Sequence, residues 1–216
     1  MRSFRNPITC ILTVSLTSML LLSGCGSSAS SALIPALKTP DFDHDYPVGE
    51  ITDMALVGQS LTCPFSEPQV LVLYGATYMR SNTGTVSISF SKDGDDSNTP
   101  LFLWEIDCAQ MSDNTPLLLY FDPSYASDTA LTDTLSGMSG LGSDSVSEAL
   151  TVLPTTFSSK TALKKQACRI EISSPDCFAG NAVTFWTTPE DCYEDGALSI
   201  GGYEQYNDLW FQLIGK

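Results

Sequence analysis

The chain has 216 residues, with 25 acidic and 10 basic side chains and a formal net charge of −15 at pH 7. This balance argues against nucleic-acid binding, which needs Lys and Arg to displace phosphate counterions. The sequence has one histidine, His44, in a Pro- and Asp-rich stretch. It therefore argues against Ser-His-Asp and Cys-His catalysis, in which a base must stand beside the nucleophile.

The first segment has the pattern of a secretory signal peptide. Arg2 and Arg5 form a basic start, and residues 8–22 are uncharged and mostly apolar, a run shorter than the roughly 20 residues of a membrane span. The run ends in Leu22-Ser23-Gly24-Cys25. This resembles the lipobox of bacterial lipoproteins, in which the chain is cut before a cysteine that carries the lipid. The alternative is an ordinary signal peptide with a chance cysteine.

We therefore expect residues 1–24 to be a lipoprotein signal peptide and residues 25–50 to be a lipid-anchored flexible linker, rich in Ser and Gly near its start. A lipoprotein anchor on Cys25 brings at least two acyl chains, which hold a protein at a membrane more stably than one chain does. The expected location is the bacterial cell membrane or outer membrane, facing the extracytoplasmic side. The membrane is then the first expected partner.

From about Ile51 the pattern changes to short apolar runs separated by turn residues such as Asn82-Thr83-Gly84. No long amphipathic helix separates them, so they predict one all-β domain over residues 51–216, an antiparallel sandwich of about eight strands. Residues 126–161 are rich in Ser, Asp and Gly, and we expect an inserted loop there, with one helical turn near 146–150. The predicted strands are 54–63, 70–79, 85–92, 101–106, 117–121, 167–173, 182–187, 197–200 and 209–214.

The segments "ATYMRSNTGTVSISF", "NAVTFWTT" and "DLWFQLIG" resemble an uncharacterised β-sandwich module of bacterial surface proteins and polysaccharide-related membrane enzymes. Asn207 stands where that module usually has Gly, and the usual module lacks the 126–161 region. The resemblance implies a jelly roll of the galactose-binding-like type, a plan whose members often bind carbohydrate. Likeness of fold alone implies no activity.

Candidate ligand-binding residues come from the same segments. Alternation along the strands places Trp186 and Trp210 opposite the expected core face, where an aromatic ring would meet a sugar. Tyr78, Arg80 and Asn82 lie in "TYMRSNTG", and the Arg80 guanidinium has the geometry to bind a sugar hydroxyl or a carboxylate. The alternatives are an internal ion pair for Arg80, and packing of each Trp at the sandwich edge or under the inserted loop.

Acidic clusters allow two weaker interpretations. Glu105 and Asp107, or the loop 190–195, would provide the paired carboxylates of a glycosidase, but such clusters also arise by chance in so acidic a chain. Residues 92–99 are oxygen-rich like a Ca²⁺ loop yet lack its terminal Glu, so a hairpin connection is favoured. The sequence therefore predicts no catalytic residue, no metal site and no cofactor, with a structural Ca²⁺ ion left open.

The cysteines of the domain have two interpretations. An exported chain meets conditions that permit disulfides, and an odd number leaves at least one thiol free or joined to another molecule. Small buried thiols without a bridge are the alternative. No Cys/His spacing typical of zinc occurs. The five cysteines are Cys63, Cys108, Cys168, Cys177 and Cys192.

The sequence thus favours a lipid-anchored, non-catalytic surface module that binds a cell-envelope polysaccharide or another envelope component. The alternative is a structural or protein-interaction lipoprotein whose partner is an envelope protein, and a hydrolase is less favoured. A concave face exposing two or more aromatic rings would favour a glycan. A flat polar face with a protruding 126–161 loop would favour a protein partner.

Overall fold

A computed structural model describes residues 36–38, 46–94, 99–138, 143–157 and 162–216. The expected signal peptide, Cys25, His44 and most of the expected linker lie outside these ranges, as do residues 95–98 of the suggested Ca²⁺ loop. Signal processing and lipidation therefore remain predictions. No helix within the described ranges has the length and apolar character needed to cross a membrane.

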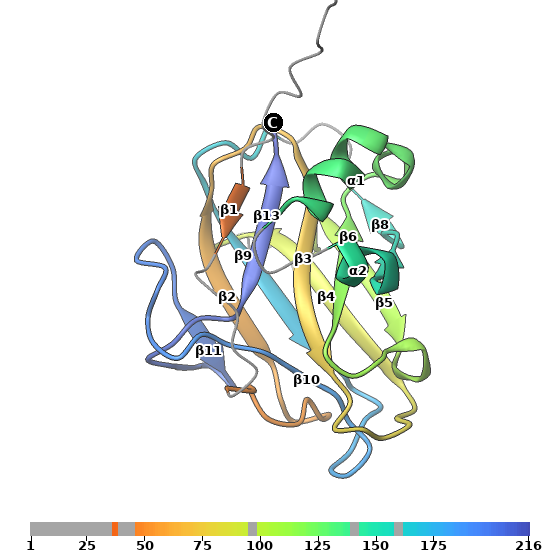
Figure 1. The fold of residues 1–216 in the computed structure, drawn as a ribbon. Coiled ribbons are helices and arrows are strands. Elements are labelled where there is room, and N and C mark those ends of the chain that lie inside the picture. The colour runs from red at the N-terminus through yellow and green to blue at the C-terminus, as the bar shows by residue number, and fades with distance from the viewer. Residues whose placement is uncertain (1–35, 39–45, 95–98, 139–142, 158–161) are drawn as a thin grey trace, which may run out of the picture. The chain divides into compact units, whose positions relative to one another are not determined.

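Two β-sheets face each other as a sandwich (Figure 1). Every strand pair is antiparallel except β6 with β7. The six-stranded sheet has the order β1 (Ala36–Lys38), β13 (Phe211–Gly215), β3 (Pro68–Ala76), β6 (Thr115–Tyr120) and β7 (Leu150–Val152), with β10 (Thr184–Phe185) also on β3. The seven-stranded sheet has the order β12 (Tyr203–Glu204), β11 (Leu198–Ile200), β2 (Val57–Cys63), β9 (Gln166–Ser173), β4 (Thr85–Lys92), β5 (Phe102–Asp107) and β8 (Thr156–Phe157).

The predicted all-β antiparallel sandwich is confirmed, and each predicted strand overlaps an observed one. The expected number of about eight strands is too low, because the described residues form a six-stranded and a seven-stranded sheet. The missed strands β1, β7, β8 and β12 are two or three residues long. Runs this short contain too little alternation to be recognised in a sequence.

The main core lies between the sheets. On β4, Val86, Ile88 and Phe90 are fully buried, while the serines between them are half-buried on the other face. A cluster of aromatic rings continues this core, formed by Phe90, Phe102, Trp104 and Phe121 with centroids 4.7–6.4 Å apart. The Trp104 indole N–H donates to the Tyr120 carbonyl at 2.9 Å, so this buried ring has its polar group satisfied.

A second apolar cluster covers the outer face of the six-stranded sheet, so all nine residues of β3 are buried. The 126–161 region provides part of this cover and is not the loop we expected. It contains α1 (Thr129–Ser136), α2 (Ser143–Glu148), β7 and β8, and the short 3-10 helix η2 (Pro123–Ser127) leads into it. Leu131 and Leu135, one turn apart on α1, are fully buried in the cluster.

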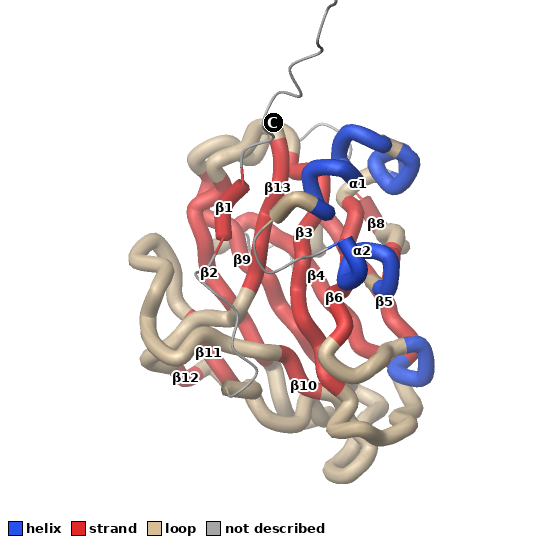
Figure 2. The backbone as a smooth tube through the Cα atoms, in the orientation of Figure 1, coloured by secondary structure: helices blue, strands red, loops and turns tan. Residues whose placement is uncertain are grey.

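The two ends of the sandwich differ in what they carry. Ala36 pairs with Ile214, so the chain enters the sheet beside its own C-terminal strand. The nine-residue β3 leads from this end to the other, a distance of about 30 Å. At that far end the loops 49–56, 77–84, 112–114 and 174–183 meet (Figure 2). We call these four segments the distal loops.

Candidate functional site

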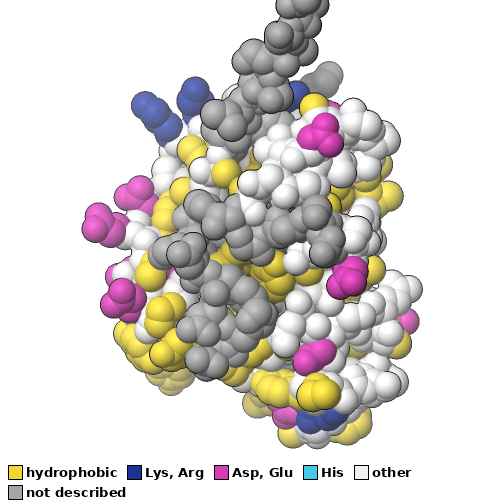
Figure 3. Space-filling view, in the orientation of Figure 1, with side chains coloured by type: hydrophobic (Ala, Val, Ile, Leu, Met, Phe, Trp, Pro, Cys, Tyr) yellow, Lys and Arg dark blue, Asp and Glu magenta, His cyan; other side chains and the backbone are white. Residues whose placement is uncertain are grey.

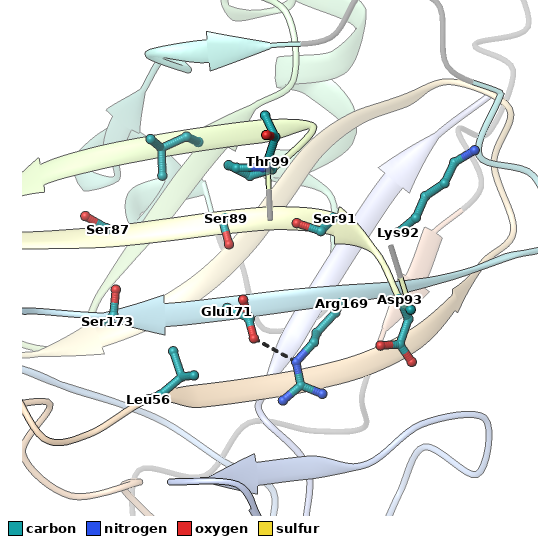
Figure 4. A pocket seen from close by; sticks show the side chains of 13 residues that line it. Leu56, Ser87, Ser89, Ser91, Lys92, Asp93, Thr99, Arg169, Glu171 and Ser173 are labelled. Carbon is teal, nitrogen blue, oxygen red and sulfur yellow. Dashed lines mark hydrogen bonds and ion pairs between the residues drawn. The ribbon is translucent and has the colours of Figure 1, made fainter. Parts of the chain in front are cut away.

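The exposed face of the seven-stranded sheet carries rows of polar side chains. Strand pairing sets Ser87 opposite Ser173, Ser89 opposite Glu171, and Ser91 opposite Arg169 across β4 and β9. Because side chains alternate along a strand, these six residues share the face that points away from the core. Figure 4 shows the hydroxyl groups on β4 lying beside the charged pair on β9.

Arg169 and Glu171 form the charged centre of this face. The Arg169 Nε donates to Glu171 Oε1 at 3.0 Å, and Nη2 donates to Ser199 Oγ on β11 at 2.7 Å. Both side chains remain about a third exposed, at 28% and 36%. The ion pair therefore fixes the guanidinium while leaving part of it, and part of the carboxylate, open to a ligand.

Gly58 on β2 makes room for this arrangement. A Cβ added at Gly58 would lie 2.2 Å from Arg169 Nη2 and 2.7 Å from its Cζ. The guanidinium therefore lies against bare backbone, across the strand that separates β9 from β11. Any larger residue at this position must displace the arginine.

The polar face is hollowed into a shallow groove of about 380 Å³, which we call the β4–β9 groove. Its size falls within the range of small-molecule sites. None of its described lining residues is aromatic, so stacking against a sugar ring is not offered there. The lining residues are Leu56, Ser87, Ser89, Ser91, Lys92, Asp93, Gly94, Thr99, Pro100, Leu103, Arg169, Glu171 and Ser173.

The "TYMRSNTG" motif lies in the distal loops, away from the groove. Tyr78 and Met79 both have a φ of +57°, in the left-handed region that non-glycine residues rarely adopt. Asp113 holds them there, because its Oδ1 accepts from the amides of Thr77 at 2.6 Å and Met79 at 3.4 Å. Burial alone would raise the pKa of Asp113, but these hydrogen bonds outweigh it and lower the pKa.

Arg80 forms an internal ion pair, which was the predicted alternative to sugar binding. Its Nη2 donates to Glu50 Oε1 at 2.6 Å and to the Ala182 carbonyl at 3.1 Å. Glu50 also accepts from the Gly180 amide. The hydrogen bond from Arg80 is the main reason that the pKa of Glu50 is lowered. Arg80 thus joins three of the distal loops.

Asn82 and Gly84 stabilise the shape of the 77–84 loop. Asn82 is 1% exposed, and its Nδ2 donates to the Thr77 carbonyl, which closes the loop on itself. Gly84 has a φ of +99°, and an added Cβ would lie 2.8 Å from the Cys177 sulfur. The Asn82 side chain is thus enclosed within the loop, and its role in ligand binding stays a prediction. Tyr78, 40% exposed, is the member of the predicted motif that offers a ring to solvent.

The two tryptophans lie on the outer face of the six-stranded sheet. Alternation placed them correctly opposite the main core, but Trp210 is 1% exposed and packs edge-on to Tyr74 in the second apolar cluster. It is covered, as the alternative of packing under the inserted region predicts, and its role in ligand binding stays a prediction. Trp186 is half-buried against the same cluster, and its indole N–H donates to Asn114 Oδ1 at 3.1 Å.

Asp107 and the 190–195 loop each take part in local structure. Asp107 caps the short helix η1 (Cys108–Gln110) by accepting from the Ala109 amide. The 190–195 loop is held by the buried Asp208, whose Oδ2 accepts from the amides of Cys192 and Tyr193 at 2.8 Å. Burial raises the pKa of Asp208. Across the described residues, no three His, Cys, Asp or Glu side chains are grouped to hold a metal ion.

Comparison with known proteins adds no further assignment. No protein-family model matches the chain, and no curated protein matches it. The alternation over residues 85–92 predicted a strand, but Ser87 and Ser89 were not among the predicted ligand-binding residues. The signal that was available is the serine at every second position, which is unusually uniform for a solvent-facing row.

Proposed function

We propose that this protein is a non-catalytic, extracytoplasmic binding module that holds a segment of a neutral glycan in the β4–β9 groove. The observation that carries the proposal is the matched set of polar groups in the groove. Serine hydroxyls both donate and accept, the Arg169 guanidinium donates, and the Glu171 carboxylate accepts. A sugar presents hydroxyl groups of the same two-way character, so this lining suits it.

Charge narrows the class of glycan. The chain is strongly acidic, at −15 overall, so a polyanionic polysaccharide would be repelled at long range. Arg169 is already paired with Glu171, which leaves no net positive charge from these two side chains. With no aromatic residue among the described lining, recognition rests on hydrogen bonds. Affinity per site is then modest, and avidity from many anchored copies would compensate.

The proposal also includes a lipid anchor at Cys25 and a jelly-roll arrangement of the sandwich. The jelly-roll arrangement of galactose-binding-like type is supported by the two facing antiparallel sheets, and the lipid anchor by the Leu22–Cys25 motif. The chain enters the fold at Ala36, at the end opposite the distal loops. Replacing Cys25→Ala is expected to release the protein from the membrane fraction. Retention of this variant in that fraction would contradict the anchor.

The binding experiment uses the full-length protein in detergent on an array of neutral and anionic envelope glycans. Arg169→Ala and Glu171→Gln are expected to reduce neutral-glycan binding at least tenfold, because each removes a charged hydrogen-bonding group from the groove. Glu105→Gln is the matched control, since Glu105 is exposed on β5 of the same sheet and does not line the groove. Equal binding by all three variants would contradict the groove as the site.

A protein partner at the distal loops is the second candidate function. Five large apolar side chains are exposed there: Met54 at 86%, Leu56 at 43%, Tyr78 at 40%, Met79 at 90% and Phe178 at 63%. Figure 3 shows hydrophobic side chains gathered at this end. Tyr78 and Met79 are also held in the left-handed conformation, and such strain is often kept for function. The test is to crosslink the protein to its neighbours in the cell envelope. If Met79→Ser abolishes a crosslink to an envelope protein while glycan binding is unchanged, this candidate is supported.

A further inference from the structure

Two pairs of buried cysteines lie close together inside the sandwich. The sulfurs of Cys108 and Cys177 are 3.8 Å apart, although the residues are 69 positions apart in sequence. Cys108 follows β5 and Cys177 lies in the loop after β9, and both are almost fully buried. A disulfide bond is about 2 Å long, so a small movement of the two side chains would bring the sulfurs to bonding distance.

The second pair joins neighbouring strands. β2 and β9 are antiparallel, with Leu61 opposite Cys168 and Cys63 opposite Gln166. Cys63 and Cys168 therefore occupy diagonal positions on one face, where both side chains are fully buried in the main core. The neighbouring Cys63 thiol is the main reason that the pKa of Cys168 is raised. Cys192, half-buried in the loop 189–196, is the cysteine outside both pairs.

We propose that Cys108–Cys177 and Cys63–Cys168 are the two native disulfides of this domain when it folds under oxidising conditions, and that Cys192 stays a free thiol. The oxidant is a small-molecule or protein disulfide. One protein thiolate attacks the oxidant's S–S bond and releases a thiolate, and the second protein thiolate then displaces the remaining half. Each bridge forms with loss of two protons and two electrons, which reduce one disulfide to two thiols.

The order of events follows from burial. Removal from water, reinforced by the neighbouring Cys177 thiol, raises the pKa of Cys108 to about 12, so the folded reduced protein holds almost no thiolate there. Because the thiolate is the reacting form and both sulfurs are buried away from an oxidant, the Cys108–Cys177 bridge forms before the core closes. The folded reduced chain is therefore expected to resist oxidation at this pair, whereas the unfolded chain oxidises readily.

The two bridges would fix different parts of the fold. Cys63–Cys168 would staple β2 to β9 near the end where the chain enters. Cys108–Cys177 would tie the end of β5 to the distal loops, next to the "TYMRSNTG" segment, since the Cys177 thiol donates to the Thr83 carbonyl at 3.3 Å. The bridge would then restrict the movement of the loop that carries the exposed residues Tyr78 and Met79.

The test uses the full chain carrying Cys10→Ser and Cys25→Ser, changes that lie outside the described fold. The protein is unfolded, reduced, and refolded with oxidised and reduced glutathione, then alkylated, digested without reduction and mapped by mass spectrometry. The expected result is two linked peptides, 108 with 177 and 63 with 168, and alkylated Cys192. Bridges that join one pair to the other, or alkylation of both members of either pair, would overturn the proposal.

Thermal stability with and without reducing agent is a second test of the two disulfides. Reducing agent is expected to lower the Tm of the oxidised protein by on the order of 10 °C. A Cys108→Ala/Cys177→Ala variant, which keeps the site apolar, is expected to show a smaller drop. Cys192→Ser is the matched control and should behave as the parent does. A parent protein whose Tm is unchanged by reductant would contradict the bridges.

Discussion

The outer faces of the two sheets are opposite in character. On the seven-stranded sheet, the outward positions of β4 and β9 are Ser, Arg and Glu, and they line an open groove. On the six-stranded sheet, the outward positions of β3 are Val70, Val72 and Tyr74, and helix α1 and its neighbours cover them. β4 therefore alternates between buried and half-buried positions, whereas β3 is buried on both faces. A sandwich that covers one outer face leaves the other free for a ligand.

The largest effect is expected on the covered face. Trp210→Ala should lower the free energy of unfolding by about 3–5 kcal/mol, because a fully buried indole leaves a large cavity. Trp186→Ala, at a half-buried ring against the same cluster, should cause a clearly smaller loss. Urea denaturation of both variants measures the difference. Equal losses would mean that the cover over Trp210 opens readily.

Helix α1 provides the next test of the cover. Leu135→Ala should lower the free energy of unfolding by about 2–4 kcal/mol, because its side chain is fully buried in the second cluster. Asp133→Ala, exposed on the same helix, should change it by less than about 0.5 kcal/mol. Urea denaturation again measures both. Loss of the difference between these two variants would show that α1 does not depend on the sheet.

The open face predicts a coupling that stability measurements can detect. Gly58→Ala should destabilise the protein by about 1 kcal/mol, because the added Cβ displaces the Arg169 guanidinium from its place across β2. The same change in an Arg169→Ala background should have little effect. A double-mutant cycle isolates this interaction. Additive effects of the two substitutions would contradict the packing of Arg169 over Gly58.

The distal loops predict the smallest effect, a loss of stability in acid. The folded pKa values of Glu50 and Asp113 lie below the unfolded values, which are about 4.3 and 3.9. Their contribution is thus present above about pH 4 and is lost as the pH falls through the folded pKa values. Asp113→Asn should flatten this acid dependence, and Glu105→Gln serves as the control. An unchanged pH profile in Asp113→Asn would contradict the role of Asp113.

The fold was predictable where strands are long. The alternation over Thr85–Lys92 predicted β4 with its correct bounds, because one face of that strand is buried and the other is open. Packing of a Trp under the 126–161 region was weighed as an alternative, but its helices were not predicted beyond one turn near 146–150, since they are short and rich in Ser and Thr. These compositions are typical of loops, and tertiary contacts with an apolar sheet decide their structure.

The candidate site was less predictable than the fold. Alternation placed Trp210 off the core face, but one strand's pattern does not say whether that face is covered. The groove depends on the pairing of β4 with β9, which brings Ser91 opposite Arg169 across 78 positions of sequence. The charge of Arg80 in an acidic chain was enough to suggest an internal ion pair, which the structure contains. Its partner Glu50 required the fold to bring the distal loops together.

The most direct test of the β4–β9 groove as the ligand site is an NMR titration of the full-length protein with the neutral glycan that gives the strongest array signal. We predict shifts of the amides of Ser87, Ser89 and Glu171 and of the Arg169 Nε–H, with residues 77–84 and 174–183 unchanged. Shifts confined to residues 77–84 and 174–183, or absent at saturating glycan, would contradict the groove as the ligand site.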